Sequence, residues 1–367
     1  MNTQIQDKFT FKNGQTMRNR VVLAPMTICA SEPGGYVSQA DIDFFARRSR
    51  SVGMVITGST YVHPLGKSFA ESFSGAEDDK IEGLSRLAKA IKDQGALAIV
   101  QLYHGGRMVL PDLIDGQPVA PSAVKAPRDY LAEPRALKNA EVEQVIEDFL
   151  SAIRRAIQAG FDGVELHGAN TYLIQQFVSP HSNVRQDKWG GSLNNRLRFP
   201  KTLLKRAKQL VKEEADRPFL IGYRFSPEEL EEPGIQLYDT LQLLEQLIYH
   251  QVDYLHISTT DVWRSSIRDS QDSEPVIQKI IRKINDRVPL IGVGQIETKQ
   301  DAQRVLDAGI PLFALGKALL LDPDWTEKVV SGRESEVIRA YRDELQADLA
   351  LPTAFVEDAR SYLEGKD

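Results

Sequence analysis

From Val21 almost to its C-terminal end, the chain alternates between short apolar runs typical of strands and amphipathic stretches typical of helices. The strand-like runs are Val21–Pro25, Gly53–Ser59, Leu97–His104, Gly163–His167, Pro218–Phe225, Tyr254–Thr259, Pro289–Gly294 and Pro311–Gly316. Such alternation indicates βα units around a parallel sheet. Eight units close most naturally into a (βα)8 TIM barrel, for which about 250 residues suffice.

The helices expected between these strands are Gln39–Ser51, Ile81–Gln94, Ala140–Gly160, Asn194–Ala215, Tyr238–Gln251, Pro275–Asp286 and Lys299–Ala308. Glycines such as Gly160 and Gly309 follow a helix and precede the next strand, as helix C-termini favour. Residues 105–139 and 171–193 break the pattern as two long loops, which we expect on the catalytic face of the barrel because loops this long are usually functional.

We predict a single α/β domain over residues 1–367, with three parts. Residues 1–20 form a β-hairpin around Asn13 and Gly14 that closes the bottom of the barrel. Residues 21–320 form the barrel, and residues 321–367 add helices. These helices pack on the outside of the barrel or against a partner subunit, so a homo-oligomer is one of the two alternatives.

Charge and cysteine content exclude several classes of function. A net charge of −6, from 45 basic and 51 acidic residues, argues against a nucleic-acid partner. No apolar run approaches the roughly 20 residues of a membrane span, and the start of the chain lacks a signal-peptide pattern, so we expect a cytoplasmic protein. Cys29 is the single cysteine, which excludes disulfides and cysteine-based metal clusters, and the scattered histidines suggest no metal site.

The fourth strand leads into three polar side chains that can hold and protonate a small molecule. Glu165 and His167 share one face of that strand, and His167 stands at its carboxyl end, where ligands bind in parallel α/β folds. His167 and Asn170 can both donate hydrogen bonds to one oxyanion, while the phenol of Tyr172 can deliver a proton. We interpret this segment as catalytic.

Other strand ends carry polar groups expected to converge over the barrel mouth, namely Thr27, Gln101, His104 and Arg224. A buried Gln101 needs a partner with both donors and acceptors, such as the imide edge of a flat heterocycle. Arg224 needs an anionic or strongly polar partner, or else a buried salt bridge. His256, on the sixth strand, is interpreted as a packing residue.

Strands seven and eight end in glycine-containing turns with Gly294, Gln295, Gly316 and Lys317, which in such barrels commonly bind a phosphate through backbone N–H groups. There is no P-loop and no nucleophile elbow. Cys29 is interpreted as a small apolar side chain and not as a nucleophile.

With these residues in place, the chain resembles the old yellow enzyme family of FMN-dependent NAD(P)H oxidoreductases over essentially its whole length. The resemblance rests on Leu23–Thr27, Val100–Leu102, His167–Phe177, Ser179–Asn183, Trp189–Ser192, Asn195–Arg196, Arg198–Phe199, Tyr223–Arg224 and Gly316–Lys317. Two departures are Lys317, where an arginine is expected, and Thr27, where some members have a cysteine.

The resemblance implies FMN across the barrel mouth, with its phosphate at Gly294, Gln295, Gly316 and Lys317. It places Pro25, Met26, Thr27 and Ser59 along the isoalloxazine, Gln101 at the pyrimidine edge, and Arg224 where the reduced flavin carries negative charge. His167 contacts both cofactor and substrate. His167 and Asn170 bind a substrate carbonyl, and Tyr172 protonates the α-carbon.

The implied reaction is ping-pong reduction of α,β-unsaturated carbonyl compounds, and of quinones or nitro compounds, by NADH or NADPH. With one cysteine there is no iron–sulfur cluster, so electrons are expected directly from the nicotinamide. The alternatives are another FMN barrel, such as a tRNA dihydrouridine synthase, and a flavin-binding protein without turnover.

Overall fold

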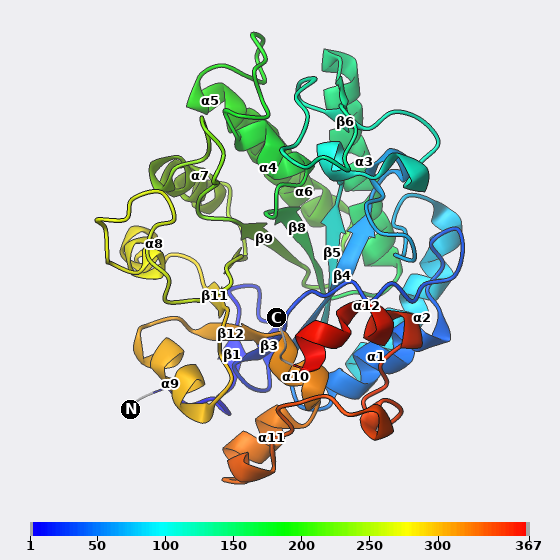
Figure 1. Ribbon diagram of the computed structural model, residues 1–367, viewed down its shortest axis with the longest axis vertical. Coiled ribbons are helices and arrows are strands. Elements are labelled where there is room, and N and C mark those ends of the chain that lie inside the picture. The colour runs from blue at the N-terminus through cyan, green and yellow to red at the C-terminus, as the bar shows by residue number, and fades with distance from the viewer. Residues whose placement is uncertain (1–2, 365–367) are drawn as a thin grey trace.

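The computed structural model describes residues 3–364, which form a closed barrel of eight parallel strands surrounded by helices (Figure 1). Around the barrel the strand order is β3 (Val21–Leu23), β4 (Met54–Tyr61), β5 (Leu97–Tyr103), β8 (Gly163–Gly168), β9 (Leu220–Phe225), β10 (Tyr254–Ile257), β11 (Leu290–Val293) and β12 (Leu312–Leu315). The predicted fold class is confirmed. Residues 1–2 and 365–367, the outermost parts of the predicted cap and C-terminal extension, lie outside the described residues.

The longer helices lie outside the strands and surround the barrel (Figure 1). They are α1 (Gln39–Ser49), α2 (Ile81–Asp93), α3 (Asn139–Gln158), α6 (Arg198–Glu214), α7 (Leu237–Tyr249), α8 (Val276–Ile284) and α9 (Lys299–Asp307). The helix predicted from Asn194 is instead two helices, because the short α5 (Leu193–Arg196) ends before α6 begins. Pro200 has no N–H to donate to the Arg196 carbonyl, which favours a restart of the helix at this point.

The N-terminal hairpin lies under the amino ends of the strands, as predicted. Its strands β1 (Phe9–Thr10) and β2 (Thr16–Met17) are antiparallel, and Gly14 between them has a φ of +91° that a side chain rarely adopts. The ring centroid of Phe11 lies 6.2 Å from that of Tyr254, and the Gln15 amide donates to the Asp162 carbonyl at 3.0 Å. These contacts close the bottom of the barrel.

The two long segments contain more secondary structure than predicted. Residues 105–139 include β6 (Val119–Ala120) paired in parallel with β7 (Arg135–Ala136), and the segment after β8 contains α4 (Leu173–Val178). Gln176 of α4 joins the two segments, since its amide accepts from the Arg107 N–H and donates to the Gly105 carbonyl. Because this contact links residues far apart in the sequence, local pattern could not predict it.

The C-terminal extension consists of α10 (Lys317–Leu321), α11 (Trp325–Val330) and α12 (Thr353–Glu364), with short 3-10 turns before α12. Helix α12 packs against α10, and the Nζ atom of Lys317 lies 4.8 Å from the ring centroid of Tyr362 on α12. The extension therefore reaches the side of the barrel at which the strands end. Within residues 3–364, no helix has the length and apolar character needed to cross a membrane.

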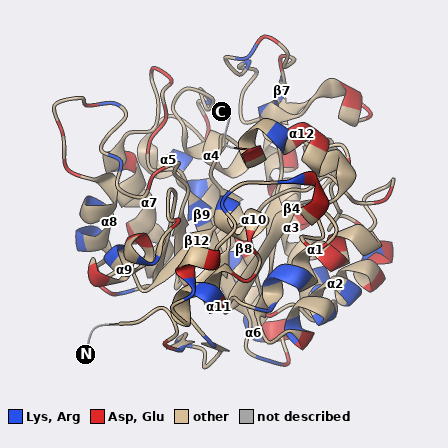
Figure 2. Ribbon diagram, turned by 60° about the horizontal axis from the view of Figure 1, so that its bottom comes forward, with Lys and Arg blue, Asp and Glu red and all other residues tan. Residues whose placement is uncertain are grey.

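Charges of both signs are interspersed over the outer helices. Figure 2 shows basic and acidic positions together on α1, α2 and α9, whereas α8 carries basic positions only, and no extended face of one sign is seen in that view. Many of these charges are paired, such as Arg287 with Glu245 and Arg47 with Asp324. The barrel surface thus carries many ion pairs, each of which contributes little to stability at exposed positions.

Candidate active site

A row of hydrogen-bonded polar side chains crosses the inside of the barrel near the carboxyl ends of its strands. The Ser59 N–H donates to Thr27 Oγ1 at 3.1 Å, and the Ser59 hydroxyl donates to Gln101 Oε1 at 3.2 Å. Gln101 Nε2 in turn donates to Glu165 Oε1 at 2.8 Å. Three predicted residues, Thr27, Ser59 and Gln101, are thereby joined to one another and to Glu165 through protein contacts. We call Thr27, Ser59, Gln101, Glu165 and His256 the polar row.

Gly58 permits the first of these contacts. A Cβ atom built at Gly58 would lie 2.6 Å from the carbonyl oxygen of Met26, so the close approach of β4 to Met26 and Thr27 requires glycine. The pairing of β4 with β5 shifts register between Ile56 and Ser59, as at a β-bulge. This irregularity turns Ser59 towards both Thr27 and Gln101.

Glu165 and His256 were missed as members of the site. His256 was interpreted as a packing residue, but its Nδ1 lies 2.9 Å from Glu165 Oε2, and both side chains are fully buried. Burial works to raise the pKa of Glu165, but His256, Arg224 and Gln101 outweigh it and hold that pKa below its ordinary value. The carboxylate is therefore ionised. The sequence did offer one signal for this site: Glu165 lies two positions before His167 and on the same face of the strand.

Arg224 is a buried cation with no hydrogen bond or ion pair to any side chain in residues 3–364. It stands beside His167 and His256 in the register of β8, β9 and β10. Burial lowers its pKa, while the nearby charge of Glu165 raises it. The alternative of a buried salt bridge to Arg224 is wrong, because the oxygens of Glu165 accept from Gln101 and contact His256 instead. A buried guanidinium without a partner is costly unless a ligand supplies one.

His167 and Tyr172 lie against each other at the end of β8. Their ring centroids are 5.0 Å apart with the planes at 77°, and Tyr172 makes a similar edge contact with Tyr103. Burial lowers the pKa of His167 far below its ordinary value, so the ring is neutral, and its Nδ1 has no partner among the described residues. Burial also raises the pKa of Tyr172 to about 12, which keeps its phenol protonated. The phenol can therefore donate a proton at neutral pH.

Asn170 is held by two serines. Its backbone has a φ of +54°, its N–H donates to Ser226 Oγ at 3.0 Å, and its Oδ1 accepts from Ser258 Oγ at 2.8 Å. Because Ser258 occupies the amide oxygen, the Nδ2 group of Asn170 is left to donate to a ligand. Left-handed backbone at an asparagine is a common feature of functional turns.

Two cavities open at the carboxyl ends of the strands and share Thr259 and Thr260. One, of about 780 Å³, is lined by Asn170, Ser226 and Ser258 among others, and we call it the Asn170 cavity. The other, of about 400 Å³, contains all four residues predicted to bind a phosphate: Gly294, Gln295, Gly316 and Lys317. Both volumes are in the range of small-molecule sites.

Pro25, Met26 and Thr27 follow β3 and are partly exposed. A Cβ on Gly316 would lie 3.7 Å from Met26 Sδ, so this segment adjoins the turn predicted to hold a phosphate. The structure thus brings the predicted residues of β3, β4, β5, β8, β9, β11 and β12 to one end of the barrel.

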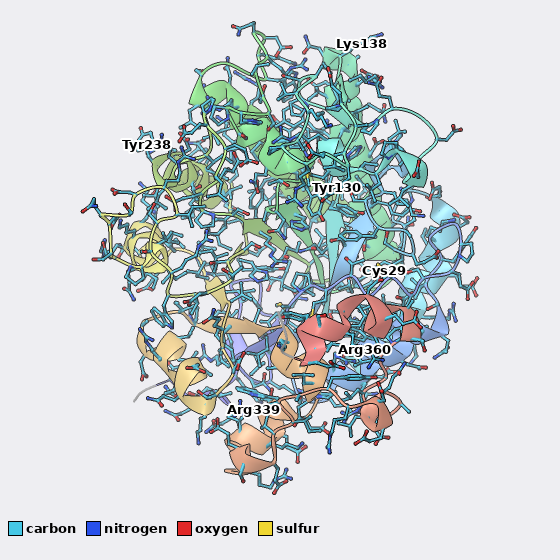
Figure 3. All side chains as sticks on the ribbon, in the orientation of Figure 1. Cys29, Tyr130, Lys138, Tyr238, Arg339 and Arg360 are labelled. Atoms are coloured by element: carbon cyan, nitrogen blue, oxygen red, sulfur yellow. The ribbon has the colours of Figure 1, made fainter. Side chains whose placement is uncertain are left out.

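His104 lies elsewhere and is not among the residues lining either cavity. Its Nδ1 accepts from the Gly106 N–H at 3.0 Å, and a Cβ on Gly66 would come within 2.7 Å of its ring. The expectation that His104 faces the mouth was wrong, because the ring packs under the loop that follows β5. Cys29 lies beside α12 (Figure 3), and burial followed by the charges of Asp358 and Glu71 raises the pKa of its thiol. A raised pKa suits an inert thiol.

Comparison with known proteins identifies the family. Residues 7–336 match the model of the NADH:flavin oxidoreductase / NADH oxidase family. This chain belongs to that family. The expected enzyme class, the FMN cofactor and the nicotinamide reductant, which the resemblance implied, are confirmed with it.

The family's curated relatives include two kinds of chain. The NADH:fumarate oxidoreductase of Klebsiella pneumoniae is 47% identical over 340 residues, which are 92% of this chain and 37% of the relative. The NADH:acrylate oxidoreductase of Vibrio harveyi is 43% identical over 96% of this chain and 36% of the relative. A probable NADH-dependent flavin oxidoreductase of Bacillus subtilis is 45% identical over 90% of this chain and 89% of its own length. The chain therefore spans little more than a third of the first two relatives.

Solved structures of the family share the barrel. Morphinone reductase aligns with a TM-score of 0.79 and 26% identity over 97% of this chain and 93% of its own. The old yellow enzyme homologue from Zymomonas mobilis aligns with a TM-score of 0.77 and 27% identity, over 90% of this chain and 93% of its own.

The residues at the barrel mouth of this family member fit FMN. Arg224 and His167 carry buried polar atoms without partners, and Lys317 adds a cation beside Gly294 and Gly316. A group with a phosphate and a polar ring edge would satisfy them. Gln101 differs from expectation, since protein partners already occupy its oxygen and one of its two N–H donors.

Proposed function

We propose that this chain reduces carbon–carbon double bonds conjugated to a carbonyl group, with NADH or NADPH as the reductant. The observation that carries the proposal is the placement of three donors at and just after the end of β8: the rings of His167 and Tyr172 lie against each other, and Asn170, whose Nδ2 is left to donate, lines a cavity of about 780 Å³. Bound FMN would supply the hydride chemistry of the reaction. Quinones and nitro compounds are further oxidants that the same donors could bind.

Each of the three side chains has a separate role in the proposal. The neutral ring of His167 and the Nδ2 group of Asn170 donate hydrogen bonds to the carbonyl oxygen, which draws electron density out of the double bond. Tyr172 delivers the proton to the α-carbon, and its pKa of about 12 keeps that proton in place until the carbanion character develops. Neither His167 nor Asn170 needs to change charge.

The remaining assignments support binding of the cofactor. We propose that Gly294, Gln295, Gly316 and Lys317 hold the FMN phosphate and that Arg224 faces the edge of the ring where negative charge develops. Pro25, Met26, Thr27, Ser59 and Gln101 would line the ring system, with residues 1–367 acting as one FMN-binding domain. A cytoplasmic location and the absence of a nucleic-acid partner stay predictions.

Two relatives are named for fumarate and acrylate, which both contain a double bond conjugated to a carboxyl group. Their names support an unsaturated carbonyl compound as the oxidant in this family member too. This chain spans only 37% and 36% of those relatives. We therefore propose for it the reduction of the double bond alone, and not the activity of the whole relative.

Replacement of Tyr172 by Phe tests the proposal in two half-reactions. We expect Tyr172→Phe to slow oxidation of the reduced flavin by 2-cyclohexenone by about 100-fold, since general acids contribute at least that much. Flavin reduction by NADH, followed separately by stopped-flow absorbance, should slow far less. Equal losses in both half-reactions would contradict the role of Tyr172.

The wild-type protein separates the alternatives. Steady NADH consumption with 2-cyclohexenone in the absence of RNA is expected here, whereas a tRNA dihydrouridine synthase would need RNA. A flavin-binding protein without turnover would show reduction of its flavin and no steady consumption.

A further inference from the structure

Two arginines line the Asn170 cavity without a carboxylate partner. They are Arg128, from the segment after β5, and Arg264, from the loop between β10 and α8. Among the ion pairs and side-chain hydrogen bonds of residues 3–364, Arg264 makes none through its side chain, and Arg128 makes one to the neutral Tyr130 hydroxyl. Most other arginines of the protein are paired, as Arg268 is with Glu232 a few residues further along the same loop.

The carboxylates that line the same cavity already have hydrogen-bond or ion-pair partners elsewhere. Glu228 accepts from Ser266 Oγ and the Ile267 N–H, and Glu229 accepts from Gln175 Nε2 and the Ile235 N–H. Glu231 lies 3.9 Å from the buried Arg107. These contacts hold the loops in place, and no hydrogen bond or ion pair from them reaches Arg128 or Arg264 in the part of the chain described. The two cations therefore remain available to a ligand.

The backbone around Arg264 is held in position. The Arg264 N–H donates to the Asp261 carbonyl, and its own carbonyl accepts from the Val276 N–H at 3.0 Å. The loop is tied to the end of β9 through the two hydrogen bonds from Ser266 and Ile267 to Glu228. The Nε atom of Arg264 is buried and has no partner within residues 3–364. A buried, positioned and unsatisfied N–H donor on a cation fits an anionic acceptor.

Arg128 is exposed and approaches the site from the opposite segment. Its Nη1 lies 3.1 Å from the hydroxyl of Tyr130, an exposed residue that is labelled in Figure 3. The positive charge of Arg128 also acts on Tyr172, since after burial and Arg224 it is among the groups that influence the pKa of that phenol. Arg128 therefore lies within electrostatic reach of the proposed proton donor.

We propose that Arg264 and Arg128 form an anion subsite that binds a carboxylate or phosphate group of a ligand whose reacting end lies at His167 and Asn170. The inference rests on the proposed function and specifies its ligand class. Two sources fit this chemistry: a carboxylate on the oxidising substrate, away from its reacting carbonyl, and the phosphates of the nicotinamide dinucleotide. A forked guanidinium binds either group through paired hydrogen bonds.

The first arm of the test measures the oxidising substrate. The holoenzyme is assayed with 4-oxopent-2-enoate and with its methyl ester, which differ by one negative charge, and the ratio of kcat/KM for acid over ester is compared among variants. If the anion is a substrate carboxylate, Arg264→Gln should lower this ratio by about tenfold or more, since hydrogen bonds to charged groups are worth that much. Arg264→Lys should restore part of it, and Arg128→Gln should lower it by a smaller factor.

The second arm measures the reductant. Flavin reduction by NADH is compared with reduction by 1-benzyl-1,4-dihydronicotinamide, which has no phosphate. If the anion is the dinucleotide phosphate, Arg264→Gln should lower the ratio of these two rates by about tenfold, with the acid-to-ester ratio retained. Arg206→Gln is the matched control, because Arg206 lies on α6 and pairs with Glu147 outside the cavity. The subsite would be overturned if Arg264→Gln and Arg128→Gln each gave the same acid-to-ester ratio and the same ratio of reduction rates as this control.

Equilibrium binding keeps the subsite separate from the proposed function. If the wild-type reduced flavin reacts with neither acid nor ester, the proposed function fails, and the subsite is then judged by flavin absorbance titrations with 4-hydroxybenzoate and methyl 4-hydroxybenzoate. Tighter binding of the charged phenol that is lost in Arg264→Gln supports the subsite. Equal dissociation constants for the two phenols in the wild-type protein overturn it.

Discussion

The polar groups inside the barrel fall into two sets with different needs. The polar row is satisfied by its own members except at one atom: Ser59, Gln101, Glu165 and His256 Nδ1 are joined by hydrogen bonds, and only His256 Nε2 lacks a partner among the described residues. Arg224 on β9, between the strands of Glu165 and His256, and His167 on the same strand as Glu165 carry buried nitrogen atoms without partners among the described residues. The first set resembles an ordinary buried network, which supports the fold, whereas the second is kept at a cost to stability and points to a ligand.

The largest effect is expected from breaking the polar row at its centre. Glu165→Leu leaves the Gln101 amide and His256 Nδ1 unpaired and removes the carboxylate whose charge raises the pKa of Arg224. We expect a loss of about 3–5 kcal/mol in the free energy of unfolding, measured with urea on the apoprotein. Glu165→Gln is the control, because it keeps the shape and one acceptor and should lose less. Similar small losses in both variants would show that the network contributes little to the fold.

The unpartnered set should behave in the opposite way. Arg224→Met removes a buried cation that has no protein partner, so the apoprotein should unfold with equal free energy or gain about 1–4 kcal/mol. Affinity for FMN, measured by quenching of flavin fluorescence, should fall because the anionic edge of the cofactor loses its cation. Arg224→Lys keeps the charge and should retain more of the affinity. A large loss of apoprotein stability in Arg224→Met would place Arg224 with the polar row instead.

A pH titration separates buried neutral histidines from exposed ones. Burial lowers the pKa of His104 to about 3, so the folded protein binds fewer protons than the unfolded chain between about pH 3 and 6.5. Its contribution to stability is present above pH 6.5 and is lost as the pH falls. Lowering the pH from 7 to 5 should therefore cost about 2 kcal/mol through His104 alone.

The measurement is urea unfolding at both pH values, with His104→Asn for comparison. Asn can still accept from the Gly106 N–H but does not titrate. The difference between the free energies of unfolding at pH 7 and pH 5 should therefore shrink by the contribution of His104. An unchanged difference would mean that His104 is protonated in the folded protein.

The smallest effect concerns the orientation of Asn170. Ser258→Ala removes the hydroxyl that occupies Asn170 Oδ1 and lets the amide turn, at a cost of about 1 kcal/mol. We expect kcat/KM for 2-cyclohexenone to fall about fivefold, in line with that energy, while FMN content stays at the wild-type level. Ser85→Ala is the control, because the Ser85 hydroxyl donates to the Ile81 carbonyl within α2, away from both cavities. A fall in FMN content in Ser258→Ala would assign Ser258 to the cofactor instead.

Much of the site was predictable because it lies at strand ends. The alternation of apolar and polar stretches set the order of the strands, and parallel strands bring their carboxyl ends together, so His167, Arg224 and Gly294 were expected at one mouth. Asn170 and Tyr172 followed from their distance to His167. These inferences needed only the period of each strand and its direction.

The partners of the same side chains were not predictable. Glu165 and His256 are 91 positions apart, and Gln101 lies 64 positions from Glu165. Their contacts depend on the register between β5, β8, β9 and β10, which no local pattern encodes. For the same reason His256 was taken as a packing residue and His104 as a mouth residue.

By itself, the sequence determined the number of βα units, the closed barrel and the list of polar groups at its mouth, because periodicity and strand direction are local properties of the chain. Only the tertiary structure decided which of those groups bind each other and which are left without a partner. Hydrogen bonding inside a barrel is set by distances between strands that are remote in sequence. That is why the unpaired Arg224 and Arg264, on which the functional proposals depend, emerged only from the folded chain.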